Sequence, residues 1–280
     1  MSCLSWLIIA FLQTAASLPP QELARDPSAP FIERSQRQFR FYPGGKVELT
    51  LGVPGDVKVV GWQRPEITVD IEKLVYRMGE EEARALASSF PVQVKYTQTE
   101  ATIRIPIGKE KKDTPAFPPG LEINLTVRVP RQRTDMRLQT VKGDLSLEDI
   151  NGWLEATLTE GSIETKSISG YFSGLTELGN VEADLSGPRW EGYEFAAVTH
   201  RGSVLLRLPL RFSAALQLET RDGALSIDYP EQLVDGESIP LVAVAKKRGQ
   251  SLSATIGDGG APVKLMTFLG DIRMEAKRDE

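Results

Sequence analysis

The 280-residue sequence contains one cysteine and one histidine. Cys3 precedes the first apolar run, in a segment that we expect to be removed, so the mature chain would contain no cysteine. This absence excludes intramolecular disulfides and thiolate chemistry. Because His200 is the only histidine, a histidine-rich metal site is excluded and a Ser-His-Asp triad is disfavoured. We expect His200 to be an exposed turn residue.

The sequence also has no basic stripe. It carries 33 Lys and Arg against 38 Asp and Glu, which gives a net charge of −5 and a pI near 5.3. Nucleic-acid-binding domains have the opposite balance, with Lys and Arg clustered on one face. The sequence therefore argues against a nucleic-acid partner, and its one basic run, at residues 246–248, is interpreted as a solvated turn.

No apolar run reaches the roughly 20 residues that a bilayer-spanning helix needs. The run from Leu4 to Leu12 is followed by Ala15, Ala16 and Ser17, which resembles a secretory signal with a small-residue cleavage site. We expect residues 1–17 to be a signal peptide, the protein to be exported, and the mature chain to have no transmembrane span.

What the sequence does contain is a repeat. Six copies share the pattern Thr-x-x-Gly, with Leu in place of Thr in one copy, and a small or acidic residue and an apolar residue follow the glycine. The first three glycines are 18 residues apart, and the next two intervals are 23 and 21 residues. The repeat glycines are Gly143, Gly161, Gly179, Gly202, Gly223 and Gly270. A period near 20 with short strands is typical of a solenoid, in which each coil buries its apolar side against its neighbours.

Alternating apolar side chains flank each glycine and predict short strands, because a strand places every second side chain on one face. In the second copy, Leu154, Ala156 and Leu158 precede the glycine, and Ile163 and Thr165 follow it on the same face. Equivalent positions in every copy form one apolar column, while the positions between them are mostly charged or small. The glycine itself stands where a turn needs a positive φ or a close backbone approach.

The pattern predicts one all-β domain. Residues 18–40 lack periodicity and are interpreted as a flexible linker, and residues 41–280 as a single β-solenoid domain. Within the domain we expect four parts: a β-rich part at 41–130 with one helix at 80–88, regular coils at 131–228, a hairpin-like excursion at 229–262, and a final coil at 263–280 that helps to cap one end of the stack.

The segment V-P-G-D-V-K-V-V-G-W at 53–62, the short Glu/Ala helix and the many T-x-x-G-[DSN]-[LIV] coils resemble the bacterial putative-adhesin family. The resemblance covers residues 41–280 and is most specific at 136–228. It implies a right-handed β-solenoid in the bacterial envelope, in the periplasm or at the cell surface, with an interaction role. The family's defining domain has no assigned function, so the resemblance supplies no catalytic motif.

The acidic residues give no distinct catalytic or metal pattern. Asp56, Asp144 and Asp271 follow glycines and could form a carboxylate ladder at one edge, but calcium-binding repeats need a denser Gly and Asp pattern. Pairs such as Glu155 and Glu160 are typical of solvated faces and do not single out glycosidase chemistry. We therefore predict no catalytic residue, no metal site and no cofactor.

Aromatic residues supply the candidate binding site. Trp153 and Tyr171 occupy equivalent positions one coil apart, on the face opposite the apolar column, and Trp190 and Tyr193 in the longer third coil could extend the patch. Such a patch could hold a sugar ring or a partner protein. The alternative is a structural role, in which these rings cover the neighbouring excursion or the helix.

Three function classes remain open. The first is a noncatalytic exported envelope protein, an adhesin-like binding or scaffolding module whose partner is a cell-surface glycan or an envelope protein. The second is a carbohydrate-active β-helix enzyme, and the third is a periplasmic lipid or glycolipid carrier. Inward-facing Thr and Ala positions favour a narrow, filled interior over a lipid-binding one. The sequence leaves the oligomeric state open.

Overall fold

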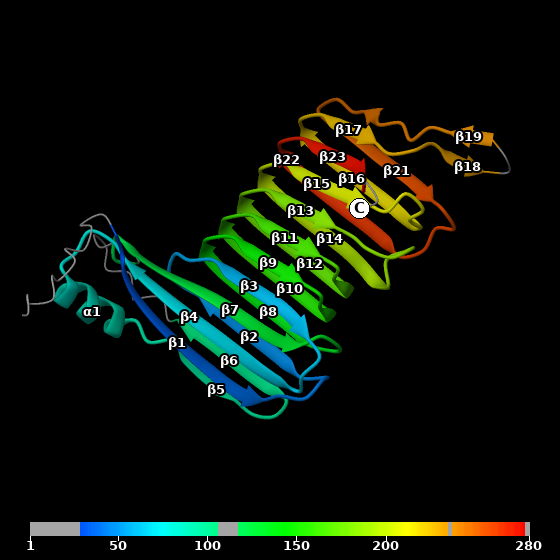
Figure 1. Cartoon of the computed structure of the whole chain (residues 1–280). Helices are drawn as coiled ribbons and strands as arrows, with labels where there is room; N and C mark the ends of the chain where they lie inside the picture. The colour runs from blue at the N-terminus through cyan, green and yellow to red at the C-terminus, as the bar shows by residue number, and fades with distance from the viewer. Residues whose placement is uncertain (1–28, 106–116, 235–236, 278–280) are drawn as a thin grey trace, which may run out of the picture.

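The computed structural model describes residues 29–105, 117–234 and 237–277, so the signal peptide predicted at residues 1–17 lies outside the described residues. In this part of the chain, two large β-sheets lie one against the other, accompanied by one helix and one small hairpin (Figure 1). The all-β prediction is confirmed. Both large sheets are mixed: the ten-stranded sheet is antiparallel at one end only, and the eleven-stranded sheet is antiparallel at both ends. The arrangement is therefore less uniform than the solenoid predicted from the repeat.

The ten-stranded sheet contains, in spatial order, β1 (Phe31–Arg40), β4 (Glu66–Val75), β7 (Leu121–Pro130), β3 (Val57–Trp62), β9 (Leu145–Glu148), β11 (Ile163–Lys166), β13 (Val181–Asp184), β15 (Val204–Leu208), β23 (Ile272–Ala276) and β17 (Leu225–Asp228).

The eleven-stranded sheet contains, in spatial order, β20 (Val244–Ala245), β21 (Gln250–Ile256), β16 (Ala214–Asp222), β22 (Pro262–Leu269), β14 (Gly192–Arg201), β12 (Ser169–Leu178), β10 (Asn151–Glu160), β8 (Asp135–Lys142), β2 (Lys46–Leu51), β6 (Glu100–Ile105) and β5 (Gln93–Tyr96). The remaining elements are the helix α1 (Glu80–Ser89) and the hairpin of β18 (Gln232–Val234) and β19 (Glu237–Ile239).

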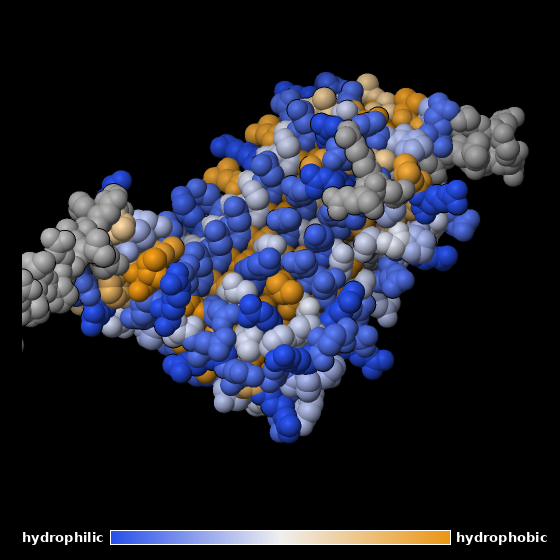
Figure 2. Space-filling model, viewed as in Figure 1, coloured by the Kyte–Doolittle hydropathy of each residue, from blue (hydrophilic) through white to orange (hydrophobic). Residues whose placement is uncertain are grey.

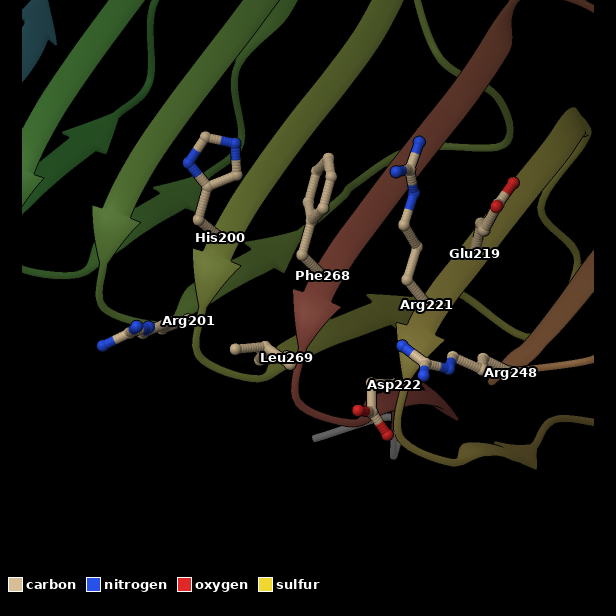
Figure 3. Close-up of a pocket in the computed structure, with 8 residues that line it drawn as sticks. All are labelled: His200, Arg201, Glu219, Arg221, Asp222, Arg248, Phe268 and Leu269. Atoms are coloured by element: carbon tan, nitrogen blue, oxygen red, sulfur yellow. The ribbon is translucent and has the colours of Figure 1, made fainter.

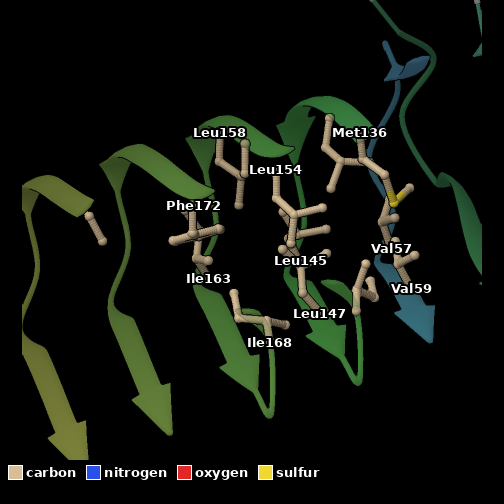
Figure 4. Close-up of a cluster of buried hydrophobic side chains, with 14 of the residues drawn as sticks. Val57, Val59, Met136, Leu145, Leu147, Leu154, Leu158, Ile163, Ile168 and Phe172 are labelled. Atoms are coloured by element: carbon tan, nitrogen blue, oxygen red, sulfur yellow. The ribbon is translucent and has the colours of Figure 1, made fainter. Parts of the chain in front are cut away.

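The core lies between the two large sheets. Strands β10 and β12 pair in parallel, with Leu154 opposite Phe172, and β11 pairs in parallel with its neighbours on the other sheet. Inward side chains from both sheets meet in the layer between them (Figure 4), and Leu154, Ile163 and Phe172 are completely buried. Fully burying each such side chain contributes about 1.5–3 kcal/mol. The apolar column predicted from the alternation is therefore the observed core.

The repeat glycines stack directly on one another. Gly161 has a φ of 139°, and a Cβ built on it would lie 2.0 Å from the carbonyl oxygen of Gly143 in the preceding coil. Gly179 stands in the same relation to Gly161. Any side chain at these positions would push two coils apart, which explains why glycine recurs in every copy.

The threonine three residues before the glycine has a specific role. The buried Thr176 hydroxyl donates a 2.7 Å hydrogen bond to the carbonyl oxygen of Gly161, and Thr199 donates an equivalent bond to Gly179. Thr220 and Thr267 repeat the contact further along the stack. Thr140 is the exception, because its hydroxyl has no hydrogen-bond partner among the described residues.

The final copy of the repeat does not close the stack. Strand β22 lies between β14 and β16, and β23 lies between β15 and β17, so the last coil in sequence is inserted between the two preceding copies. The expectation that it helps to cap one end is therefore wrong. The insertion lets β22 hydrogen-bond along both edges, while β21 runs antiparallel along the outer edge of β16 and covers it.

Residues 31–40, which the composition places in a flexible linker, instead form β1. This strand pairs with β4 along its whole length. Many of its side chains are polar and form hydrogen bonds to β4, as Arg34 does to Glu72 and Gln36 to Asp70, so the strand shows no apolar alternation. A strand held mainly by backbone and polar side-chain hydrogen bonds gives little hydrophobic signal in the sequence.

The predicted helix is confirmed as α1, and Lys73 fixes its position. The buried Lys73 ammonium group on β4 donates a 2.8 Å hydrogen bond to the Ala87 carbonyl oxygen near the end of α1. It also lies 2.8 Å from a carboxylate oxygen of Glu33 on β1. The helix is therefore tied to the β1 end of the ten-stranded sheet.

We predict that Gly161→Ala lowers the free energy of unfolding by about 2–5 kcal/mol, because it combines a left-handed backbone with displacement of the neighbouring coil. Gly44→Ala is the matched control, since Gly44 has a φ of 92° but open space where its Cβ would stand. The control should cost only about 1–2 kcal/mol. Urea unfolding of both variants measures the difference, and equal losses would contradict the stacking argument.

We also predict that Thr176→Val lowers the free energy of unfolding by about 1–3 kcal/mol, since the Gly161 carbonyl loses its buried hydroxyl partner. Thr140→Val should be nearly neutral or stabilising, because the Thr140 hydroxyl is buried without a partner. Thermal unfolding of the two variants tests the threonine ladder. A larger loss for Thr140→Val than for Thr176→Val would show that these hydroxyls do not hold the coils together.

Candidate functional site

The parallel register of β10 and β12 places Trp153 directly opposite Tyr171. Their rings stack with centroids 3.9 Å apart and planes 19° apart, and Trp153 is 45% exposed. Both side chains alternate with buried ones, so they lie on the outward face of the eleven-stranded sheet. The structure thus brings together the two residues that the 18-residue period predicts as equivalent.

Polar neighbours hold the Trp153 ring in place. Its indole N–H donates a 3.0 Å hydrogen bond to Glu155, and its backbone N–H donates a 2.9 Å bond to the Asp135 carboxylate. Arg137 on β8 forms a 2.9 Å ion pair with Glu155. The hydrogen bond from Trp153 and then the one from Arg137 hold the pKa of Glu155 below its ordinary value, so this carboxylate stays ionised.

Tyr193 joins the pair from the third coil. A register shift at the start of β12 and β14 pairs Gly170 with Gly192 and Tyr171 with Glu194, which leaves Tyr193 as an extra residue. Such a bulge redirects a side chain. The Tyr193 ring is 78% exposed, and its centroid lies 6.5 Å from that of Trp153. We call Trp153, Tyr171 and Tyr193 the aromatic platform.

Trp190 does not belong to the aromatic platform. It is only 4% exposed, packs edge-on against Phe195 with ring centroids 5.3 Å apart, and donates an indole hydrogen bond to the Gly170 carbonyl oxygen. The prediction that it extends the patch is therefore wrong. Trp190 lies between β13 and β14, where the longer interval lets the chain leave the strand pattern, and alternation no longer tells inward from outward positions.

The residues that orient Trp153 were missed in the sequence, although a signal for one of the contacts exists. Asp135 is 18 residues before Trp153, and Arg137 is 18 residues before Glu155. In the regular coils, the neighbour of an outward residue on the preceding strand lies one 18-residue period earlier in the sequence. Complementary charges at that interval indicate the Arg137–Glu155 pair, whereas the Asp135 bond goes to a backbone N–H and leaves no such signal.

The acidic residues after the glycines have a backbone role. The Asp56 carboxylate accepts a 2.9 Å hydrogen bond from the Asp144 N–H, and the Asp144 carboxylate accepts a 2.8 Å bond from the Ser162 N–H. Asp271 accepts one from Ala224 in the same way. These bonds between successive coils account for the small polar residues at this position. Within the described ranges, no three His, Cys, Asp or Glu side chains are grouped as a metal site would need.

His200 lies at the end of β14 and not in a turn, and it is partly buried. Its ring Nδ1 shares a hydrogen bond with the Glu177 carboxylate on β12, and the ring packs at a steep angle against Phe268 on β22, with centroids 4.8 Å apart. The face of the molecule shown in Figure 2 is mainly hydrophilic, with hydrophobic side chains in small separate groups.

Comparisons with known proteins give similarity at the level of structure. No family model matches the chain, and no curated protein matches it. A putative cell adhesion protein from Clostridium sporogenes is 13% identical, with a TM-score of 0.48, covering 88% of this chain and 100% of its own. A putative adhesin from Bacteroides fragilis is 13% identical, with a TM-score of 0.39, over 86% of this chain and 97% of its own.

A putative lipid binding protein from Parabacteroides distasonis is 9% identical, with a TM-score of 0.28, over 86% of this chain and 96% of its own. Among the described residues, no helix has the length and apolarity that crossing a bilayer requires.

We predict that replacing the two tryptophans lowers stability by very different amounts. Trp190→Ala should lower the free energy of unfolding by about 3–5 kcal/mol, because it removes a buried ring. Trp153→Ala removes mainly the stacking on Tyr171, which contributes about 0.5–1.5 kcal/mol to the free energy of unfolding in addition to the buried area. Chemical unfolding measures both. If Trp153→Ala proves as costly as Trp190→Ala, Trp153 has a structural role and the platform is not free to bind.

Proposed function

We propose that this protein is a noncatalytic, adhesin-like binding module of the bacterial envelope, which docks a glycan on the outward face of the eleven-stranded sheet. The observation that carries the proposal is the exposed, prearranged aromatic platform. Tyr and Trp rings offer apolar contact to the C–H faces of a sugar. Asp135, Arg137 and Glu155 beside them offer partners for its hydroxyl groups.

The architecture proposed for the module is a right-handed β-solenoid over the coils from β8 to β15, within one domain that includes β1 and so begins near residue 31. A strand that returns to the same sheet in parallel favours a right-handed crossover. In-register pairing of β8, β10, β12 and β14 supports a solenoid in this region. An array of this kind presents a long, regular outer face, which suits an extended ligand.

Two observations favour binding over the alternatives. The acids considered for glycosidase chemistry have structural partners, since Glu155 pairs with Arg137 and Glu160 with Lys142. A lipid carrier would need an accessible apolar interior. The inward positions instead hold packed side chains that are almost fully buried, such as Leu158, Phe172 and Phe195.

Export and location need their own test. We expect the mature protein in the periplasm or at the cell surface. Protease treatment of intact cells that express a C-terminally tagged protein, compared with lysed cells, separates the two. Digestion on intact cells indicates the surface, and protection until lysis places the protein inside the envelope and excludes adhesion.

The binding experiment is a screen of the purified protein against arrayed surface glycans. We predict that the double variant Trp153→Ala/Tyr171→Ala loses at least tenfold in affinity for the bound glycans. Tyr96→Ala is the control, because Tyr96 is an exposed aromatic that stacks on Phe39 at the far end of the sheet. Glycan binding that survives the double substitution overturns the proposal, as does a response to envelope proteins alone.

A further inference from the structure

A second site lies on the same outward face, where strands β14, β22 and β16 end. An open hollow of about 670 Å³ is lined there by the arginines Arg201, Arg221 and Arg248, together with Phe268 and Leu269. Figure 3 shows these side chains gathered around the ends of the three strands. The three arginines come from distant parts of the sequence, which is why no motif points to them.

The inserted final coil builds this hollow. Thr199 pairs with Thr267, and Thr267 with Thr220, so the residues that follow them lie side by side on the outward face. Phe268 therefore stands between His200 and Arg221. The Arg221 guanidinium lies over the Phe268 ring, 4.4 Å from its centroid. Arg248 reaches the hollow from the turn between β20 and β21, within the excursion.

The charges around the hollow are unbalanced. Glu219 is neutralised by Lys246, 3.0 Å away, which leaves Asp222 as the free carboxylate at the site. Among the described residues, no carboxylate lies within ion-pair distance of Arg201, Arg221 or Arg248. In a protein with a net charge of −5, three exposed, unpaired guanidinium groups around one hollow form a local positive field.

We propose that this hollow binds the carboxylate groups of an acidic polysaccharide. Guanidinium groups are planar, always charged and matched to carboxylates by paired N–H donors. Phe268, with Arg221 over its ring and His200 at its edge, gives the hollow an aromatic wall that a sugar ring can contact. This inference rests on the proposed function and names its ligand class.

The position of the hollow favours a polymer over a single sugar. Strand β16 lies three strand spacings from β12, so the hollow is about 14 Å from Tyr171 across the sheet. Along the strands, His200 is level with Glu177, which is six residues beyond Tyr171, a distance of about 20 Å. The aromatic platform and the hollow are thus on the order of 25 Å apart on one face. A chain of several sugars can occupy both sites, and its affinity then exceeds that for either part.

The experiment measures binding of polygalacturonate, neutral dextran and free galacturonate to the wild-type protein. Polygalacturonate should bind at least tenfold more tightly than either comparison ligand, and its affinity should fall as salt is raised. Arg221→Gln should weaken polygalacturonate binding about tenfold, and the triple variant Arg201→Gln/Arg221→Gln/Arg248→Gln should reduce it to the level of dextran. Arg104→Gln is the control, because Arg104 is exposed on β6, far from the hollow.

The results separate the two proposals. If the Trp153→Ala/Tyr171→Ala variant loses polygalacturonate binding and the triple arginine variant does not, the proposal for the aromatic platform is supported and the proposal for the hollow is overturned. If polygalacturonate binds no better than dextran, the hollow is overturned, and the glycan array still decides the proposed function. If free galacturonate binds as tightly as the polymer, the assignment of a polysaccharide as the ligand is overturned.

A variant that fails to fold would confuse this result, so stability without ligand is the second measurement. The loss of the Arg221–Phe268 contact and the relief of repulsion among exposed charges act in opposite directions, so the melting temperature of the triple variant should change by only a few degrees at low salt. A drop of more than about 10 °C would show that the arginines serve mainly the fold, and would overturn their assignment to a ligand.

Discussion

The structure depends on the close approach of successive coils at their glycines. A Cβ at Gly161 would lie 2.0 Å from the Gly143 carbonyl oxygen, and the same contact recurs at Gly179 and Gly202. This approach sets the distance at which the threonine hydroxyl reaches the previous glycine and the turn carboxylate reaches the next N–H. The threonine and carboxylate contacts each give a backbone group at the turn a hydrogen-bond partner.

A fixed stacking distance also determines the outer face. Because the coils stay in register, equivalent positions form straight rows across the eleven-stranded sheet, and each row places one residue per strand. One row brings Trp153 onto Tyr171, and another brings His200, Phe268 and Arg221 together. The proposed ligand contacts are therefore consequences of the same register that buries the core.

The sequence predicts those features that depend on regular spacing. The 18-residue period and the alternation identify the core column, the glycine turns and the Trp153–Tyr171 pair. Features outside that period could not be predicted in this way. Trp190 lies in an irregular connection, β1 has polar side chains on both faces, and the final coil pairs with strands that precede it by more than 40 residues. At the final coil the order of strands in the sheets differs from their order along the chain, and a sequence period cannot indicate such a change.

The insertion of the final coil connects the fold to the proposed second site. Phe268 and Leu269 enter the hollow only when β22 lies between β14 and β16, and β16 in turn pairs with β22 and β21. A ligand that contacts residues from β14, β22 and β16 at once binds only the fully inserted arrangement. By linkage, such a ligand stabilises that arrangement. The three arginines repel one another in its absence, so an acidic glycan would also relieve this repulsion at the end of the stack.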